Sequence, residues 1–212
     1  MIRTEWRKQS PRPVAIIWLD RPEKKNALTP GMLDDLCSAL TQAGSQATVV
    51  VLAGQGGAPC AGVDLALCRE NSGALKHLLG GLSRAIRLMR ELPCPVVAAA
   101  HGAVIAGGCA LLGGADIVVT HESCKFGYPV VRLGISPAVS TPFFVASIGH
   151  GRARERQLGG QLFTGVQAMQ WGLAHAMAAT PEQVIEEACI IADQLACKPA
   201  GGLNATKEWL NE

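Results

Sequence analysis

Aromatic and charged residues are scarce in this chain of 212 residues: Phe, Trp and Tyr make up 4%, and Asp, Glu, Lys and Arg 17%. Because 49% of the residues are hydrophobic, the core must be aliphatic, which is typical of sheets that are buried on both faces. The net charge of +2 does not indicate the concentrated basic face of a nucleic-acid-binding protein. We therefore expect no nucleic-acid partner, and either one large α/β domain or two small ones.

Long unbroken apolar runs are also missing. The most apolar region, residues 95–120, is interrupted by glycines, by His101 and by Asp116, so it does not predict a membrane span. The N-terminal segment MIRTEWRKQS is charged, and no apolar stretch of signal-peptide length follows it. These absences predict a soluble, cytoplasmic protein.

Paired cysteines are absent as well. The eight cysteines stand singly, with no CxxC pair, and most lie in apolar runs where a thiol behaves as a small hydrophobe. We expect reduced, structural thiols and no metal site. The glycine-rich segment AGQGG is not followed by GK[ST], which excludes a phosphate-binding P-loop of the usual kind.

Hydrophobic patterning predicts strands that alternate with helices in the first half of the chain, and mostly helices in the second. One helix is expected to begin near Thr29, with Pro30 in its first turn. The expected strands cover residues 14–19, 48–53, 96–100 and 117–120, with a short glycine-started helix between the last two. Further helices are expected over residues 72–91, 142–148, 152–158, 166–171 and 181–197.

Two glycine-rich turns are candidates for chemistry: Cys60–Leu65, which follows a predicted strand and its loop, and Val104–Ala110, which opens a predicted helix. The first backbone N–H groups of a helix have no partner inside it, and the helix dipole favours negative charge there. One donor from each turn would make an oxyanion hole for a thioester carbonyl. The alternative is that these glycines only permit close packing or positive φ angles.

Five segments, in order, are similar to those of the crotonase (enoyl-CoA hydratase/isomerase) superfamily. They are WLDRPEKKNALTPGML (18–33), PCAGVDL (59–65), PVVAAAHGAVIAGGCALLGGADIVV (95–119), FGYPVVRLGISPA (126–138) and LFTGVQAMQWGLAHAM (162–177). The resemblance covers residues 14–207. It implies a single α/β domain over residues 1–212 with the crotonase-like (ClpP/crotonase) spiral of ββα units. The spiral core would occupy about residues 1–150, and a helical C-terminal part, shorter than is usual in the family, about residues 151–212.

The resemblance also implies roles for particular residues. The backbone N–H groups of Val63 and Gly107 would form the oxyanion hole. No permanent cofactor is implied, since coenzyme A enters as part of the substrate. The residues that would border the CoA and acyl groups are Lys24, Lys25, Ala27, Leu28, Ala61, Asp64, Leu65, Ala110, Pro129, Val130 and Leu133.

Two positions depart from the family pattern. Hydratases of the family carry a glutamate one helical turn after the second oxyanion-hole glycine, and another before the VRLG segment. The matching residues here are Ala110 and Val130. Water addition needs groups that activate water and handle the α-proton, and neither side chain can do so. The two-carboxylate hydratase route is therefore not expected, nor is isomerisation by the second glutamate alone.

Few residues offer a replacement. Tyr128 is a speculative catalytic group that could hydrogen-bond the substrate, or it could pack beneath its turn. His77 is expected in solvent, and His101 is expected to support the turn at Gly102. Ser136 could face the acyl group or cap the following segment. Cys60 and Cys109 adjoin the two donor turns, but no evident partner would lower the pKa of either thiol.

Two classes of function remain. The first is an enzyme acting on acyl-CoA or acyl-phosphopantetheine thioesters through an enolate, with decarboxylation favoured. The second is a catalytically silent homologue that binds CoA esters or partners an enzyme. The resemblance implies a homotrimer or a hexamer. Because the chain ends soon after residues 205–211, the acyl pocket is expected to be more open, or to be completed by another subunit.

Overall fold

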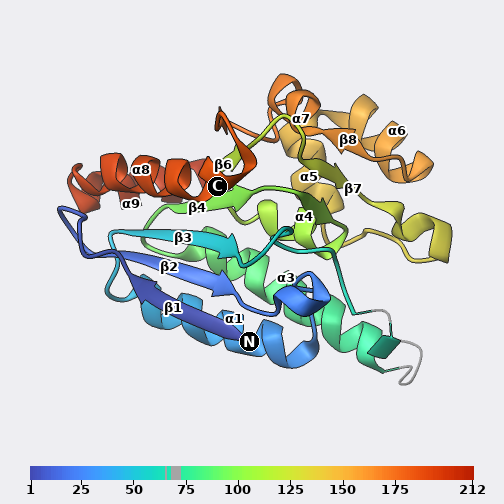
Figure 1. Cartoon of the computed structure of the whole chain (residues 1–212), viewed down its shortest axis with the longest axis horizontal. Helices are drawn as coiled ribbons and strands as arrows, with labels where there is room; N and C mark the ends of the chain where they lie inside the picture. The colour runs from blue at the N-terminus through green and yellow to red at the C-terminus, as the bar shows by residue number, and fades with distance from the viewer. Residues whose placement is uncertain (65, 68–72) are drawn as a thin grey trace.

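The structure is a computed structural model of the chain and describes residues 1–64, 66–67 and 73–212. Its main sheet has the strand order β1-β2-β3-β4-β6-β9 (Figure 1). β1 (Ile2–Trp6) runs antiparallel to β2, and the other neighbours are parallel. These are β2 (Val14–Leu19), β3 (Val49–Gly54), β4 (Val96–Ala100), β6 (Ile117–Thr120) and β9 (Ala176–Met177).

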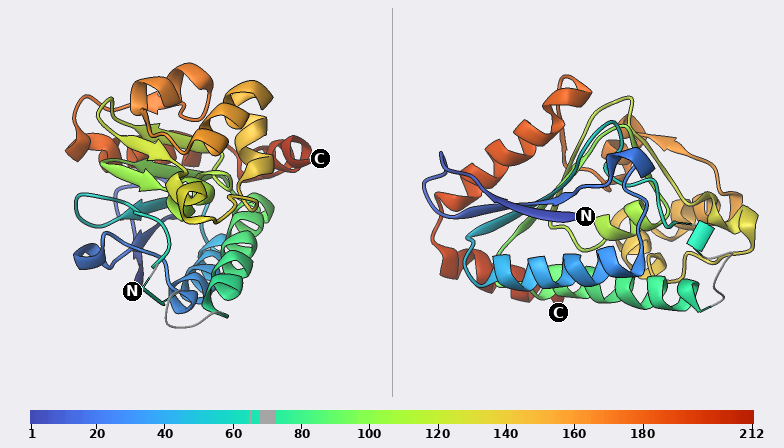
Figure 2. Two further views of the ribbon diagram at one scale, coloured as in Figure 1. Left: turned by 90° about the vertical axis from the view of Figure 1, so that its right-hand side faces the viewer. Right: turned by 60° about the horizontal axis from the view of Figure 1, so that its bottom comes forward.

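The central strands are buried on both faces, which explains their unbroken apolar sequences. On β2, Ala15 and Ile17 face helices α1 (Pro30–Gly44) and α3 (Ala74–Glu91), whereas Ile16 and Trp18 face α8 (Val184–Ala196). Figure 2 shows α1 and α3 side by side on one face of the sheet and α8 on the other. The predicted strands are confirmed to within one residue at either end.

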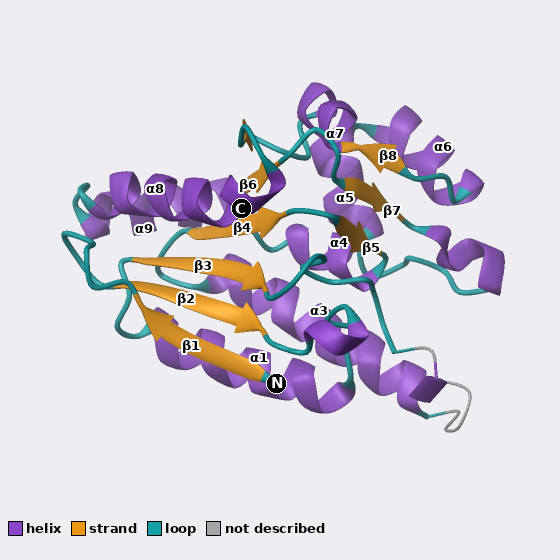
Figure 3. Ribbon diagram, viewed as in Figure 1, coloured by secondary structure: helices purple, strands orange, loops and turns teal. Residues whose placement is uncertain are grey.

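A second, three-stranded sheet is formed by short strands. It pairs β5 (Ala103–Ile105), β7 (Lys125–Gly127) and β8 (Phe163–Thr164), and it lies beside the main sheet (Figure 3). Phe126 and Phe163 stack at its centre with ring centroids 5.5 Å apart. The helices around it are α4 (Gly107–Leu112), α5 (Thr141–Ile148), α6 (His150–Gly159) and α7 (Gly165–Trp171).

The remaining elements are the 3-10 helices η1 (Pro22–Lys24), η2 (Pro129–Leu133) and η3 (Pro181–Gln183), and helix α9 (Ala200–Asn211). The helix expected from residue 181 begins as η3 and becomes α-helical only at Val184. α9 is tied to α3 by Lys207, whose buried ammonium donates to the carbonyl oxygen of Met89 at 2.7 Å. None of the helices in the described ranges is long and apolar enough to cross a membrane.

Candidate functional site

The first turn of the site is held in place by Asn26. Its side chain is fully buried; Oδ1 accepts from the backbone N–H of Arg21 at 2.7 Å, while Nδ2 donates to the carbonyls of Gln55 and Ala58 at 2.8 and 2.9 Å. Lys25 and Asn26 have positive φ angles, which Asn tolerates better than most residues. Asn26 therefore fixes the segment after η1 against the loop after β3.

That segment forms a one-residue parallel bridge between Leu28 and Val63. Leu28 donates its N–H to Gly62 O at 2.8 Å, and its carbonyl accepts from Asp64 N at 2.9 Å. In such a parallel bridge, Val63, the residue paired with Leu28, points its own N–H away from the segment that contains Leu28. Among the described residues, the N–H of Val63 has no hydrogen-bond acceptor.

The second turn opens helix α4. Ala106 has φ 49° and ψ −104°, a strained conformation for a residue with a side chain, and its N–H donates to Gly127 O at 2.8 Å. The first helical hydrogen bond runs from Ala110 N to Ala106 O, at 2.9 Å. The N–H of Gly107 thus precedes the intrahelical pattern and has no acceptor in the described part of the chain.

The two turns meet closely. A Cβ on Gly107 would lie 3.2 Å from Cδ1 of Leu28 and 3.3 Å from Cγ1 of Val63. A Cβ on Gly108 would overlap the carbonyl oxygen of Cys60, which accepts from Ile105 N at 3.0 Å. Glycine is therefore required at 108 for this approach. The structure brings together Val63 and Gly107, the two residues that sequence comparison paired.

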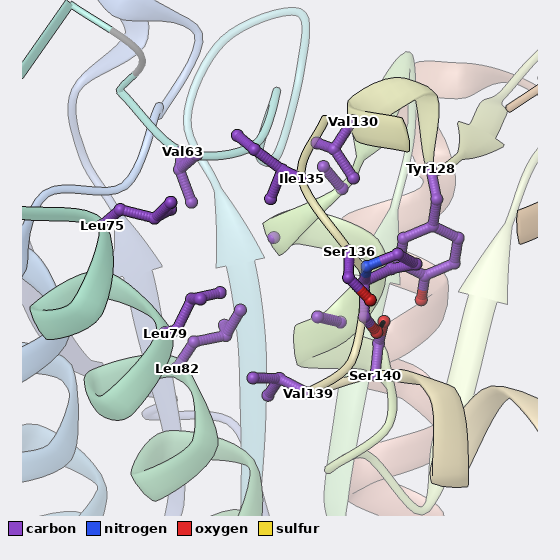
Figure 4. A pocket seen from close by; sticks show the side chains of 14 residues that line it. Val63, Leu75, Leu79, Leu82, Tyr128, Val130, Ile135, Ser136, Val139 and Ser140 are labelled. Atoms are coloured by element: carbon purple, nitrogen blue, oxygen red, sulfur yellow. Dashed lines mark hydrogen bonds between the residues drawn. The ribbon is translucent and has the colours of Figure 1, made fainter. Parts of the chain in front are cut away.

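Beside these turns lies a narrow cavity with a volume of about 40 Å³ (Figure 4). Leucines of α3 form one wall, and the segment from Tyr128 to Ser140 forms the wall opposite. No carboxylate, imidazole or amine of the described residues lines it. The lining residues are Val63, Leu75, Leu79, Leu82, Ala106, Gly107, Ala110, Tyr128, Val130, Ile135, Ser136, Pro137, Val139 and Ser140.

Ala110 and Val130, which the family resemblance predicts to stand in place of glutamates, both line this cavity. Each is buried, and each contributes only methyl groups to the wall. Tyr128 is 2% exposed and packs edge-on against Phe144, with ring centroids 5.0 Å apart. Burial raises the pKa of the Tyr128 phenol well above its ordinary value. The cavity therefore has no described side chain that accepts a proton near neutral pH.

The polar side chains in the wall are three hydroxyl groups. Figure 4 shows the hydroxyl of Tyr128 directed toward Ser140. Ser140 Oγ in turn donates to Pro137 O at 2.9 Å. Ser136 lies on the same wall and is exposed.

The two cysteines beside the turns are not nucleophiles in this state. Burial raises the pKa of Cys60 to about 12, and it raises the pKa of Cys109 further. Cys109 Sγ donates to Val104 O at 2.9 Å and accepts from Gly127 N at 3.3 Å. These contacts fix β5 and β7 around the start of α4. All seven cysteines in the described ranges are unpaired thiols, and no group of three His, Cys, Asp or Glu residues there could hold a metal ion.

The residues expected to border CoA lie in different environments. Lys24 and Lys25 are exposed beside the first turn, and Ala27 and Ala61 are half-buried. The side chain of Leu28 is fully buried beneath Gly107. Leu65 lies outside the described residues.

Asp64 forms an ion pair that the sequence did not predict. Its Oδ2 accepts from Arg21 Nη1 at 2.9 Å, and this partner holds the pKa of the carboxyl below its usual range. Arg21 also donates to Ala27 O at 3.1 Å, so the pair fastens the two segments that form the bridge.

Of the remaining expected contacts, Pro129 and Leu133 belong to η2 and are not among the cavity-lining residues. Leu133 is 56% exposed. The two histidines behave as expected: His77 is exposed on α3, and His101 supports its turn through a 2.8 Å contact between Nε2 and Gly56 O.

Comparison with known proteins identifies the family of the chain. The family model described as enoyl-CoA hydratase/isomerase matches residues 9–212. A Thermus thermophilus protein whose name assigns it to the enoyl-CoA hydratases is 34% identical over 203 residues, covering 93% of this chain and 80% of its own length. The crotonyl-CoA hydratase of Syntrophomonas wolfei is 28% identical over 204 residues, covering 94% of this chain and 78% of its own length.

Among solved structures, the enoyl-CoA hydratase of Bacillus anthracis superposes with a TM-score of 0.92 at 28% identity, covering 99% of this chain and 82% of that one. The predicted crotonase-like α/β fold is thereby confirmed. Together, the family match and the shared fold show that this chain belongs to the enoyl-CoA hydratase/isomerase family.

Proposed function

We propose that the protein is an enzyme for acyl-CoA or acyl-phosphopantetheine thioesters that stabilises an enolate with the backbone N–H groups of Val63 and Gly107. The observation that carries this proposal is that two backbone N–H groups, which have no acceptor among the described residues, border a mostly aliphatic cavity. Donors fixed by backbone geometry in a dry site stabilise a developing oxyanion strongly. The rigid bridge at Leu28 and the strained turn at Ala106 hold the two donors in place.

The cavity does not favour the two-carboxylate hydratase route. Hydration requires one group that activates water and one that handles the α-proton, within hydrogen-bond reach of the substrate. Ala110 and Val130 stand at the two relevant positions, and the pKa of Tyr128 is raised, so that the phenol stays protonated near neutral pH.

Decarboxylation of a malonyl-type or glutaconyl-type thioester needs no such base. In the malonyl case, the bond between the α-carbon and the carboxylate breaks, and its electron pair passes into the enolate whose oxygen the two N–H groups hold. Carbon dioxide leaves, and a proton from water completes the α-carbon. An apolar wall of Ala110 and Val130 disfavours the charged carboxylate and thereby assists its loss.

The CoA portion would lie over the first turn. Lys24 and Lys25 are free in solvent to reach the phosphates, and Ala27, Ala61 and the backbone at Asp64 would border the pantetheine. Leu28 would contribute through its backbone, since its side chain is buried. Pro129 and Leu133 would border the acyl end from η2. A homotrimer or hexamer is the assembly proposed from the family resemblance.

The second candidate is a protein that binds CoA esters without turning them over. The absence of an ionisable group with an ordinary pKa from the described cavity wall favours it. The two candidates differ in a single observable, which is the formation of product.

The deciding experiment is incubation of the purified protein with crotonyl-, methylmalonyl-, glutaconyl- and methylglutaconyl-CoA, with products read by mass spectrometry. We expect loss of carbon dioxide from a carboxylated ester and no water added to crotonyl-CoA. Retention of esters on a filter without any product would favour the binding protein. Hydration of crotonyl-CoA would overturn the proposed route.

A further inference from the structure

A second, larger hollow lies next to the acyl cavity, and the segment Ile135–Pro137 lines both. The hollow has a volume of about 620 Å³ and is formed by η2 and helices α5 and α6. We call this hollow the α5–α6 groove; in Figure 1 its two helices lie beyond the smaller sheet.

The groove is lined by apolar side chains and by basic and polar ones. Val131, Val145 and Leu158 supply apolar surface, and Leu158 is 70% exposed. His150 and Arg154, which stand one helical turn apart on α6, supply the charged and polar surface. No acidic side chain of the described residues lines the groove. This combination of apolar and basic lining residues suits a ligand with an apolar chain and an anionic end group.

One buried polar group in the groove lacks a partner. Gln157 is 9% exposed, and its Oε1 lies 3.0 Å from Thr141 Oγ1, whose single hydroxyl hydrogen it shares with Pro137 O, also at 3.0 Å. Its Nε2 has no hydrogen-bond partner within the described part of the chain. Buried amide donors are nearly always paired, so an unpaired donor in a groove wall indicates that a ligand atom accepts there.

We propose that the α5–α6 groove binds the carboxylate end of an alkyl chain. Gln157 Nε2 donates to the carboxylate, and Arg154, with His150 beside it, supplies the positive charge. The alkyl chain lies along Val131, Val145 and Leu158. The same chemistry has two possible sources: a free fatty carboxylate, or the distal carboxylate of a dicarboxylic acyl group whose thioester lies at Val63 and Gly107. The second source rests on the proposed function.

The test is calorimetric titration of the full chain with octanoate and with octan-1-ol, which has the same chain without the charge. Octanoate is expected to bind more tightly. Arg154→Gln should weaken octanoate binding about fivefold, and Gln157→Leu about threefold, because each removes a partner of the carboxylate. Arg152→Gln is the matched control: it makes the same charge change on an exposed residue of the same helix that does not line the groove, and it should leave the affinity unchanged.

Equal binding of octanoate and octan-1-ol, no binding of octanoate, or equal losses in Arg154→Gln and Arg152→Gln would overturn the proposal. The sources are separated by comparing octanoyl-CoA with the mono-CoA thioester of octanedioate. If Arg154→Gln weakens only the dicarboxylic thioester, and octanoate competes with that thioester, the acyl end is the occupant. If octanoate and both thioesters bind together without competition, the occupant is a free carboxylate. Octanoate binding requires no thioester turnover, so this test can succeed even where the proposed reaction fails.

Discussion

The acyl cavity and the α5–α6 groove share the segment Ile135–Pro137 and are chemical opposites. The cavity has a volume of about 40 Å³, and its described lining is mostly aliphatic, with hydroxyl groups only on Tyr128, Ser136 and Ser140. The groove has a volume of about 620 Å³, and it is lined by Arg154, His150 and Gln157, whose amide nitrogen has no hydrogen-bond partner in the described part of the chain. One surface of the segment is suited to destabilise a carboxylate, and the other to hold one.

This difference indicates which groups would contact a substrate in each region. In the cavity, the backbone N–H groups of Val63 and Gly107 face a lining that is mostly aliphatic. In the groove, recognition depends on side chains. Substitutions should therefore have opposite consequences in the two regions, and three predictions use that contrast.

The largest effect is expected from Gly107→Pro, which removes one backbone donor at the cavity. Proline suits the first turn of a helix, but at this position its ring must displace Leu28 and Val63 and it restricts the backbone of Ala106, so activity is compared only in protein shown to be folded. Loss of one oxyanion donor should reduce turnover of the preferred thioester by about 10²–10³-fold. The measurement is initial rate by mass spectrometry, with circular dichroism to verify folding.

Gly151→Pro is its matched control, since it places proline in the exposed first turn of α6, where a Cβ on Gly151 would meet nothing within 4 Å. Its turnover should equal that of the parent. Full activity in a folded Gly107→Pro protein would show that Gly107 is not a donor.

An intermediate effect is expected when the same carboxylate is placed in each region. Ala110→Glu buries a charge in the apolar cavity, and burial raises the pKa of such a group. Ionisation of the unfolded chain then favours unfolding as the pH rises above about 4.3, so the loss of stability should be small at pH 4 and about 2–4 kcal/mol at pH 8. Leu158→Glu lies in solvent beside Arg154 and should change the free energy of unfolding by less than about 0.5 kcal/mol.

Urea unfolding at both pH values measures these differences. Ala110→Gln, which has a similar size but no charge, separates the electrostatic loss from the loss due to crowding. If Ala110→Glu and Ala110→Gln were equally stable at pH 8, the cavity would not be the apolar environment described above.

The sequence predicted the parts of the fold that depend on local periodicity. The runs at residues 14–19 and 96–100 are buried on both faces, so their composition alone identifies them as strands. β1 was not predicted. Its sequence, IRTEW, forms an exposed edge strand and therefore has no alternating apolar pattern to identify it. The short strands β5, β7 and β8 were missed because each depends on its partners.

In the site, too, the sequence predicted what its motifs contain and missed the contacts between distant segments. Motif order predicted the pairing of Val63 with Gly107, but the buried position of Asn26 and its three hydrogen bonds depend on loops up to 32 residues away. The ion pair of Arg21 with Asp64 is likewise a contact across the fold. Nothing in the sequence around Gln157 distinguishes its unpaired amide from a glutamine in solvent.

The smallest effect is expected from Tyr128→Phe, which tests whether the phenol in the cavity wall takes part in the reaction. The substitution removes a buried hydroxyl that points toward Ser140 and should change the free energy of unfolding at pH 7 by about 1 kcal/mol at most. If the phenol only packs against Phe144, turnover should fall less than about threefold, far less than the loss expected for an oxyanion donor, with an unchanged pH profile between pH 6 and 9.

The alkaline limb provides a second readout of the same residue. Because burial raises the pKa of folded Tyr128 above the unfolded value of about 10, its contribution to stability is complete below pH 10 and is lost as the pH rises further. Tyr128→Phe should therefore lose stability less steeply than the parent between pH 10 and 11 in urea unfolding. A large fall in turnover together with a displaced pH profile would instead show that the phenol contacts the substrate, and the cavity would then share with the groove a dependence on side-chain polarity.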